Sequence, residues 1–144
     1  MVVVPTLALT AAAKPPVENI GSLLLRLQEG SAAPLVQHCV ARVPALKGPL
    51  ETEYSRFRKK FQKATAPLRT RIGANAELSK PAPRELVQQF EAMDVEMLAE
   101  IRKLEPQNYC PRLRSNLAGA TIESIRKNME SAFAQYTAVA RQNR

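Results

Sequence analysis

Tryptophan is absent from these 144 residues, glycine occurs only 5 times, and aromatic residues make up 5% of the chain. Scarce glycine argues against a fold built largely from tight turns. The abundant residues are Ala, Leu, Glu, Gln, Lys and Arg, which favour helices. Apolar residues still account for 45% of the sequence, which excludes wholesale disorder. We therefore expect an all-α domain with a mainly aliphatic core.

The usual signatures of catalysis are also missing, because no phosphate loop, dinucleotide fingerprint, nucleophile elbow or zinc-protease helix motif occurs. The single histidine, His38, precedes Cys39, but adjacent helix positions point about 100° apart and make a poor nucleophile–base pair. With Cys110, these residues supply at most three ligands for zinc. Glu96 and Glu100 share a helix face that has no aromatic wall to hold a sugar. The sequence predicts a protein that is not an enzyme and uses no cofactor or metal.

The N-terminal segment resembles part of a secretory signal. It is apolar and uncharged before Lys14, and Ala11-Ala12-Ala13 is typical of a signal cleavage site, although the basic start of such a signal is missing. Elsewhere no apolar run reaches the length of about 18 residues that a transmembrane helix needs. We assign residues 1–16 to a signal-like or disordered segment and residues 17–144 to a single helical domain. The expected location is periplasmic or secreted, with a cytoplasmic protein as the alternative.

Residues 50–72 carry the clearest helical pattern, since large apolar side chains recur there at steps of 3 and 4. These are Leu50, Tyr54, Phe57, Phe61, Leu68 and Ile72, with Ala64 in the remaining gap. Pro67 predicts a kink or a break. The other side of this helix is basic, with Arg56, Arg58, Lys59, Lys60, Lys63, Arg69 and Arg71. We expect the aromatic rings to face the core and these seven cations to form an exposed basic face, which is the predicted partner-binding site.

Further helices are expected over residues 17–27, 32–43, 84–104 and 121–140, and one or two helical turns over residues 111–118. With residues 50–72 this gives a bundle of four to five helices. Gly30 is expected to end the first helix, Ser31 and Thr121 to cap the following ones, and Pro106 to stop the helix over residues 84–104. The predicted inward side chains of that helix are Leu86, Phe90, Met93, Met97, Ile101 and Leu104. Those of the last helix are Ile122, Ile125, Met129, Phe133, Tyr136 and Val139.

The net charge of +8 is unevenly spread, because residues 50–72 are strongly basic whereas residues 73–107 are acidic on balance. If residues 84–104 pack antiparallel to residues 50–72, their carboxylates approach the cations beside the apolar stripe. These carboxylates are Glu91, Asp94, Glu96 and Glu100. Cations left in water would attract an anionic partner.

Cys39 and Cys110 are the only cysteines. An even number in a chain with a signal-like start favours one structural disulfide between them. Two buried free thiols in a cytosolic protein, or a catalytic or metal-binding role, are the alternatives.

Around these cysteines a pattern covers roughly residues 35–120. It consists of the run from His38 through Cys39 to Pro44, then Leu46, the aromatics at Tyr54, Phe57 and Phe61, and Cys110 with Leu113 and Leu117. This pattern resembles small exported (periplasmic) all-helical proteins of proteobacteria with two cysteines. The resemblance implies export and a disulfide between the two cysteines, and it carries no activity.

Together these features predict a small exported, non-catalytic helical bundle that binds another macromolecule through its basic face or a groove between helices. The partner is expected to be a protein or an anionic macromolecule. One alternative is a basic module that binds nucleic acid or another anionic polymer. It is not favoured, because the rings that would stack on bases are expected to face the core. Another alternative is an enzyme of unknown type.

Overall fold

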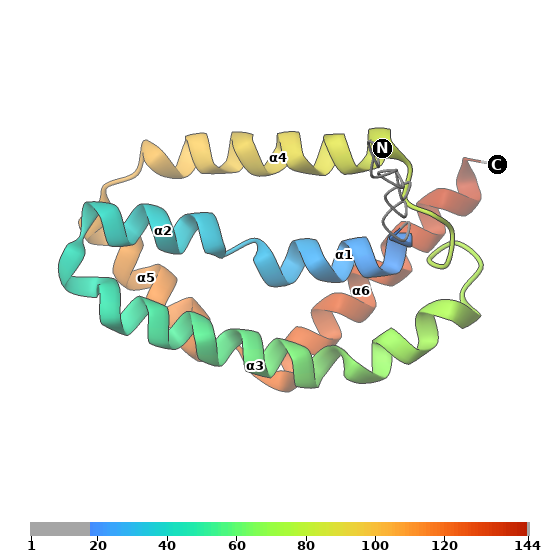
Figure 1. Cartoon of the computed structure of the whole chain (residues 1–144), viewed down its shortest axis with the longest axis horizontal. Coiled ribbons are helices and arrows are strands. Elements are labelled where there is room, and N and C mark those ends of the chain that lie inside the picture. Colours follow the sequence, from blue (N-terminus) through green and yellow to red (C-terminus); the bar gives the residue numbers. More distant parts are fainter. Residues whose placement is uncertain (1–17, 144) are drawn as a thin grey trace, which may run out of the picture.

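The computed structural model describes residues 18–143, so the signal-like assignment of residues 1–16 lies outside the described residues. Between these limits the chain forms α-helices and two short 3-10 helices, and no β-strand. In chain order the elements are α1 (Ile20–Gly30), α2 (Ala33–Arg42), η1 (Pro44–Leu46), α3 (Lys47–Arg71), η2 (Ile72–Ala74), α4 (Arg84–Arg102), α5 (Pro106–Gly119) and α6 (Ile122–Gln142). Because α1 and α2 lie end to end and act as one rod, the helices pack as a bundle of about five (Figure 1). The predicted all-α bundle is confirmed.

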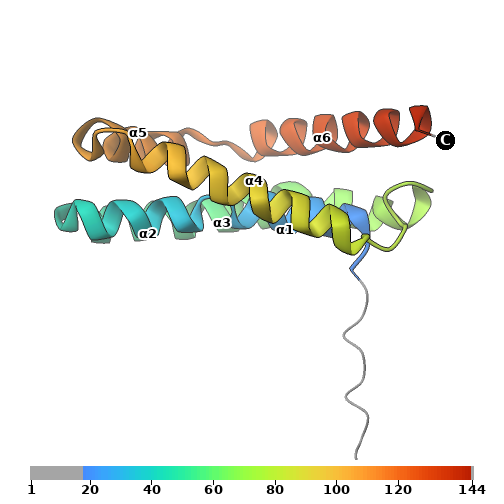
Figure 2. The same ribbon diagram turned by 90° about the horizontal axis from the view of Figure 1, so that it is seen from above.

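The rod of α1 and α2 runs between α3 on one side and α4 on the other (Figure 1). Helices α5 and α6 form a second layer that packs on α3, as the view from above shows (Figure 2). The start of α1 and the end of α6 lie at the same end of the bundle.

Helix α3 organises the core, since it contributes buried side chains to both apolar clusters found among residues 18–143. Phe61, Ala64 and Leu68 belong to the cluster shared with α1 and α6, and Leu50 belongs to the cluster shared with α2 and α5. The predicted inward stripe of this helix is therefore confirmed, with Tyr54 and Phe57 half-buried at its edge. Burying one side chain of this size contributes roughly 1.5–3 kcal/mol.

Proline does not break α3. The helix continues through Pro67 to Arg71 and bends in this region (Figure 1). Proline has no N–H, so the carbonyl one turn earlier loses its helical donor, and a bend is the usual result.

A disulfide between Cys39 and Cys110 joins α2 to α5, as predicted. Their Cα atoms lie 5.6 Å apart, and both residues are fully buried in the second cluster, with Leu50 and Leu113. The bridge therefore links helices that are already in contact through their apolar faces.

The expected packing of residues 84–104 against residues 50–72 is wrong. Helix α4 lies on the far side of α1 and α2 from α3, packs chiefly on α2, and contributes no buried residue (Figure 1). Met93, predicted to face inward, is 60% exposed, and Met97 and Leu104 are exposed as well. The steps of 3 and 4 identify an apolar face, but they do not say what covers it.

Several expected helix ends are also wrong. Gly30 belongs to α1, Ala32 rather than Ser31 occupies the N-cap of α2, and the hydroxyl of Ser31 donates to the carbonyl of Gln28 instead. Pro106 does not stop α4, which ends at Arg102, but begins α5, because proline needs no N–H donor in the first turn of a helix.

The last helix, α6, is close to its prediction. Thr121 and Ser124 form a capping box, each side chain accepting a hydrogen bond from the other residue's N–H, and Met129 and Phe133 are buried as expected. Ile122 and Val139, expected inward, lie near the two ends of α6 and are 45% and 55% exposed.

The loop that follows η2 is tied to the start of α1. The N–H groups of Ile20 and Gly21 donate to the carbonyls of Lys80 and Leu78, each at 2.9 Å. Gly21 also allows close packing, since a Cβ there would lie 2.8 Å from the side chain of Ile72. Leu78 and Ile72 are thereby fixed beside α6 and become walls of the pocket described below.

Candidate functional site

The seven cations predicted to form a basic face all lie on α3, but most of them make ion pairs or hydrogen bonds with other residues of the bundle. Arg58 and Arg69 both reach the carboxylate of Glu29 on α1, at 3.4 and 3.9 Å, and Gln62 donates to the same group at 3.4 Å. The guanidinium of Arg58 also lies 5.9 Å from the ring centre of Tyr54, in a cation–π contact. These contacts connect the end of α1 to α3 at the protein surface.

Lys60 has a structural role at the corner between α5 and α6. Its ammonium donates to the carbonyls of Ala118 and Ala120, at 3.2 and 2.9 Å. The last carbonyls of a helix lack helical donors and carry partial negative charge, so a cation there stabilises the helix end. Lys60 therefore belongs to the fold rather than to a free basic surface.

Arg56 and Arg71 are paired too, each with a different helix segment. Arg56 contacts Glu53 of its own helix at 2.9 Å, and Arg71 contacts Glu130 of α6 at 3.3 Å. Glu130 is shared, since Arg126 also lies 3.3 Å from it. The acidic partners of α3 thus come from α1, α3 and α6, not from α4 as expected.

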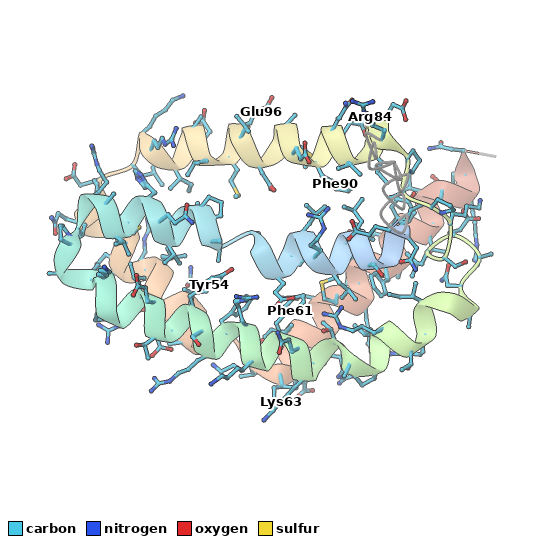
Figure 3. All side chains as sticks on the ribbon, viewed as in Figure 1. Tyr54, Phe61, Lys63, Arg84, Phe90 and Glu96 are labelled. Carbon is cyan, nitrogen blue, oxygen red and sulfur yellow. A yellow bond between two sulfur atoms is a disulfide. The ribbon has the colours of Figure 1, made fainter. Side chains whose placement is uncertain are left out.

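Lys59 and Lys63 differ from the other five cations, because neither makes an ion pair or hydrogen bond with any residue of the described range 18–143. Both are exposed, and they stand four residues apart on one face of α3. Figure 3 shows Lys63 pointing away from the bundle, whereas Phe61 points toward α1 and Glu96 points outward from α4. Two shallow depressions next to Lys59 are lined by α3 residues alone, so this surface is nearly flat.

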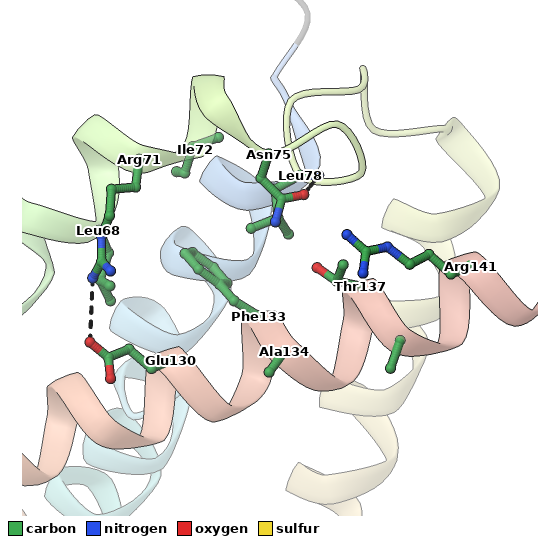
Figure 4. A pocket seen from close by; sticks show the side chains of 11 residues that line it. Leu68, Arg71, Ile72, Asn75, Leu78, Glu130, Phe133, Ala134, Thr137 and Arg141 are labelled. Atoms are coloured by element: carbon green, nitrogen blue, oxygen red, sulfur yellow. Dashed lines mark hydrogen bonds and ion pairs between the residues drawn. The ribbon is translucent and has the colours of Figure 1, made fainter.

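A pocket of about 570 Å³ lies where the end of α3, η2 and the following loop face α6 (Figure 4). Its apolar wall consists of Leu68, Ile72, Leu78 and Phe133. Its polar rim consists of Arg71, Asn75, Glu130, Thr137 and Arg141. The volume falls in the range of about 300–1,000 Å³ that is typical of small-molecule sites.

Two threonines illustrate what is unusual about this pocket. Thr65 on α3 is fully buried, and its hydroxyl donates to the carbonyl of Phe61, four residues earlier, at 2.8 Å. Thr137 on α6 has the same relation to Phe133 and is 8% exposed, yet its hydroxyl has no hydrogen-bond partner among the described residues. Leaving a buried hydroxyl unpaired costs about 1–3 kcal/mol.

His38 lies half-buried on α2, and it belongs neither to the lysine face of α3 nor to the pocket. Partial burial lowers the pKa of its imidazole below the ordinary value of 6.5, and the positive charges of Arg42 and Arg102 lower it further. These effects favour the neutral form of His38. Its neighbour Cys39 is consumed by the disulfide, and no group of His, Cys, Asp and Glu residues within positions 18–143 is arranged to hold a metal ion.

Comparison with protein-family models, with curated protein sequences and with solved structures finds no match to this chain. None of the helices over the described part of the chain is both long and apolar enough to cross a bilayer. Fold and site together define a small all-α bundle with one disulfide, a flat face with two free lysines, and a pocket with a polar rim.

Sequence reasoning found the cations but missed the pocket. Its residues come from segments far apart in the chain, and the loop that carries Asn75 and Leu78 has no periodic pattern. One signal of the pocket was present in the sequence. Phe133, Thr137 and Arg141 follow one another at steps of four, which places a hydroxyl and a cation on the same helix face as a core residue.

Proposed function

We propose that this protein is a non-catalytic binding module that docks an acidic partner protein against the outer face of α3. The observation that carries the proposal is the division among its seven cations. Five are held by groups of the bundle, whereas Lys59 and Lys63 are exposed and have no partner among the described residues. A rigid helix that presents free lysines on a flat face suits a macromolecular surface better than a small substrate.

The rigidity of this face supports the proposal. Phe61 and Ala64, which flank Lys63, are buried in the core, and Lys60 bonds the corner after α5, so the helix beneath Lys59 and Lys63 is held in place. A surface that needs no rearrangement loses less entropy when a partner binds.

Nucleic acid is the second class of anionic partner to be tested. Binding to single strands uses exposed rings that stack on bases, but Phe61 is buried and Tyr54 and Phe57 are half-buried against the core. The remaining free lysines offer phosphate contacts alone. An acidic protein is therefore the partner that we favour.

Fluorescence anisotropy with labelled poly-L-glutamate and with a DNA duplex, over a series of salt concentrations, tests the proposal. The variant Lys59→Gln/Lys63→Gln should weaken poly-L-glutamate binding about fivefold, since each exposed charge contributes on the order of 0.5 kcal/mol. The matched control Arg112→Gln/Arg114→Gln removes the same charge from exposed positions of α5 and should change binding little.

Equal losses in the two double variants would mean that net charge alone governs binding, and the docking face would be wrong. Tighter binding to the duplex than to poly-L-glutamate, with a strong salt dependence that the α3 variant reduces, would favour the nucleic-acid alternative.

We also propose that the protein acts outside the reducing cytoplasm. A buried disulfide between Cys39 and Cys110 is compatible with an oxidising compartment, where such bonds persist. Mass spectrometry of the protein isolated from its source would identify the native N-terminus. Cleavage after Ala13 supports export, and retention of Met1 contradicts it.

A further inference from the structure

The pocket between α3, η2 and α6 is, we propose, a binding site for a small monocarboxylate with an apolar tail, such as a fatty acid. Its carboxylate would lie between Asn75, Thr137 and Arg141, and its tail would lie against Leu68 and Phe133. This site is separate from the exposed lysines of α3 and does not depend on the function proposed for them.

The apolar half of the pocket suits a hydrocarbon chain. The four residues Leu68, Ile72, Leu78 and Phe133 reach it from α3, η2, the following loop and α6, and all four belong to the same core cluster. An aliphatic tail would therefore extend a surface that is already packed, and it would leave water as it enters. Figure 4 shows the side chain of Phe133 extending from α6 toward the loop that carries Leu78.

The polar half presents hydrogen-bond donors. The side-chain oxygen of Asn75 accepts from the N–H groups of Glu77 and Leu78, both at 3.0 Å. These two bonds fix the orientation of the amide, so its NH₂ group faces the pocket, as Figure 4 shows. This NH₂ group makes no hydrogen bond to a described residue.

Thr137 and Arg141 add two further donors one helical turn apart. The hydroxyl of Thr137 is buried and lacks the bond to the preceding turn that Thr65 makes. Arg141 forms no ion pair within the described range, and its guanidinium points back along α6 toward Thr137 (Figure 4). An amide NH₂, a hydroxyl and a guanidinium that converge on one space match the acceptor oxygens of a carboxylate.

The charge around the pocket selects an anion over a cation. The carboxylate of Glu130 is shared by Arg71 and Arg126, at 3.3 Å each, and its charge is therefore more than neutralised. Arg141 adds a positive charge without a described partner. A carboxylate would balance this excess, whereas an amine of the same size would be repelled.

Isothermal titration calorimetry of the whole chain with sodium octanoate tests the site, with octan-1-ol, octyltrimethylammonium and acetate as comparison ligands. Octanoate should bind with a dissociation constant below about 1 mM, the range open to a ligand of this size. Octanol and acetate should each bind at least about tenfold more weakly, because each lacks one half of the recognition. The ammonium ligand should not bind measurably.

Paired substitutions separate the polar contacts from the shape of the pocket. Thr137→Val keeps the shape and removes the hydroxyl, while Thr137→Ser keeps the hydroxyl; the first should weaken octanoate binding about tenfold and the second much less. Arg141→Gln should weaken it by a similar factor, and Arg141→Lys should retain part of the affinity. Ala134 of α6 also lines the pocket, so Ala134→Leu places bulk in it and should abolish binding.

Thr137→Val removes an unpaired buried hydroxyl and should be at least as thermally stable as the parent protein, so its loss of binding cannot be ascribed to unfolding. Octanol binding as tightly as octanoate would overturn the proposal. Equal octanoate affinities for the parent, Thr137→Val and Arg141→Gln proteins would also overturn it. So would an NMR titration with octanoate in which the amide chemical shifts of α6 do not change.

Discussion

Helices α3 and α4 carry apolar stripes of the same spacing, yet the protein treats them in opposite ways. Phe61 on α3 is 2% exposed and packs in the core between α1 and α6, whereas Met93 on α4 is 60% exposed. Helix α3 contacts helices of both layers, while α4 packs chiefly on α2. The difference shows that a helical stripe records the existence of an apolar face, and that the other helices decide how much of it is covered.

The ion pairs of the two helices differ as well, because most of those of α3 reach other helices and that of α4 does not. Cations of α3 pair with Glu29 and Glu130, so these pairs connect α3 to the neighbouring helices α1 and α6. Glu96 of α4 points outward, and Glu100 pairs with Lys103 one turn away, between exposed side chains. Exposed pairs of this kind contribute about 0–1 kcal/mol, so they add little to the attachment of α4.

Truncation of one aromatic side chain gives the largest expected contrast. Phe61→Ala should lower the free energy of unfolding by about 3–5 kcal/mol, because it leaves a cavity in the core. Met93→Ala should change it by about 0.5 kcal/mol or less, as an exposed substitution does. Urea denaturation of both variants measures the difference, and equal losses would mean that α4 is as firmly packed as α3.

Removal of the disulfide should also be costly and should loosen α4 in particular. The bond closes a chain segment with a sequence separation of 71 residues, and loss of a native disulfide typically costs about 2–5 kcal/mol. Helix α4 leads directly into α5, so the bond to Cys110 holds its C-terminal end near α2.

We therefore expect the Cys39→Ala/Cys110→Ala protein to be destabilised by that amount under urea. Its amide hydrogen exchange should accelerate more in α4 than in the middle of α3. Uniform acceleration over both helices would contradict the idea that α4 depends on the disulfide.

Two lysines of α3 give a smaller and more local contrast. Lys60→Met should cost about 1 kcal/mol, since the carbonyls of Ala118 and Ala120 lose a charged donor at the end of α5. Lys63→Met, the matched control three residues away, should stay within about 0.5 kcal/mol. Thermal or chemical denaturation of the pair decides whether the cations of α3 divide into structural and free groups.

The smallest effect concerns pH and the contact between α2 and α4. The pKa of His38 is lowered in the folded protein by burial, by Arg42 of α2 and by Arg102 of α4. The unfolded chain therefore binds the proton first, and stability that is complete above about pH 6.5 is lost as the pH falls below that value.

His38→Gln should remove this part of the pH dependence between pH 7 and 5, and the change in the free energy of unfolding should be within about 0.5 kcal/mol. A parent protein that becomes more stable as His38 gains its proton would contradict the direction of the pKa shift.

Much of the fold was predictable because local rules and tertiary packing agree. Phe61 and Leu68 lie in the core as their spacing predicts, Thr121 caps α6, and the two cysteines form the predicted bond. The arrangement of α4 was not predictable, because opposite charge suggested α3 as its neighbour while the actual contacts of α3 are made by Glu29 and Glu130. Spacing and net charge contain no information about which carboxylate is nearest.

The candidate sites were likewise only partly predictable from the sequence. The positions of the α3 cations follow from the sequence, but the engagement of Lys60 depends on the corner between α5 and α6, which exists only in the folded bundle. The pocket beside Thr137 depends on Asn75 and Leu78, which a loop brings to α6. Such a site is a property of the assembled helices and has no local pattern.

The separation of 71 residues between Cys39 and Cys110 also sets an order of events during synthesis. At about 5–20 residues per second, Cys39 is made roughly 4–14 s before its partner. During that interval α1, α2 and α3 can begin to pack while the first thiol is still reduced. The two cysteines of this chain can pair within the molecule in one way. The bond therefore requires an oxidant but no disulfide reshuffling. The covalent link thus closes late, over helices that have already been made.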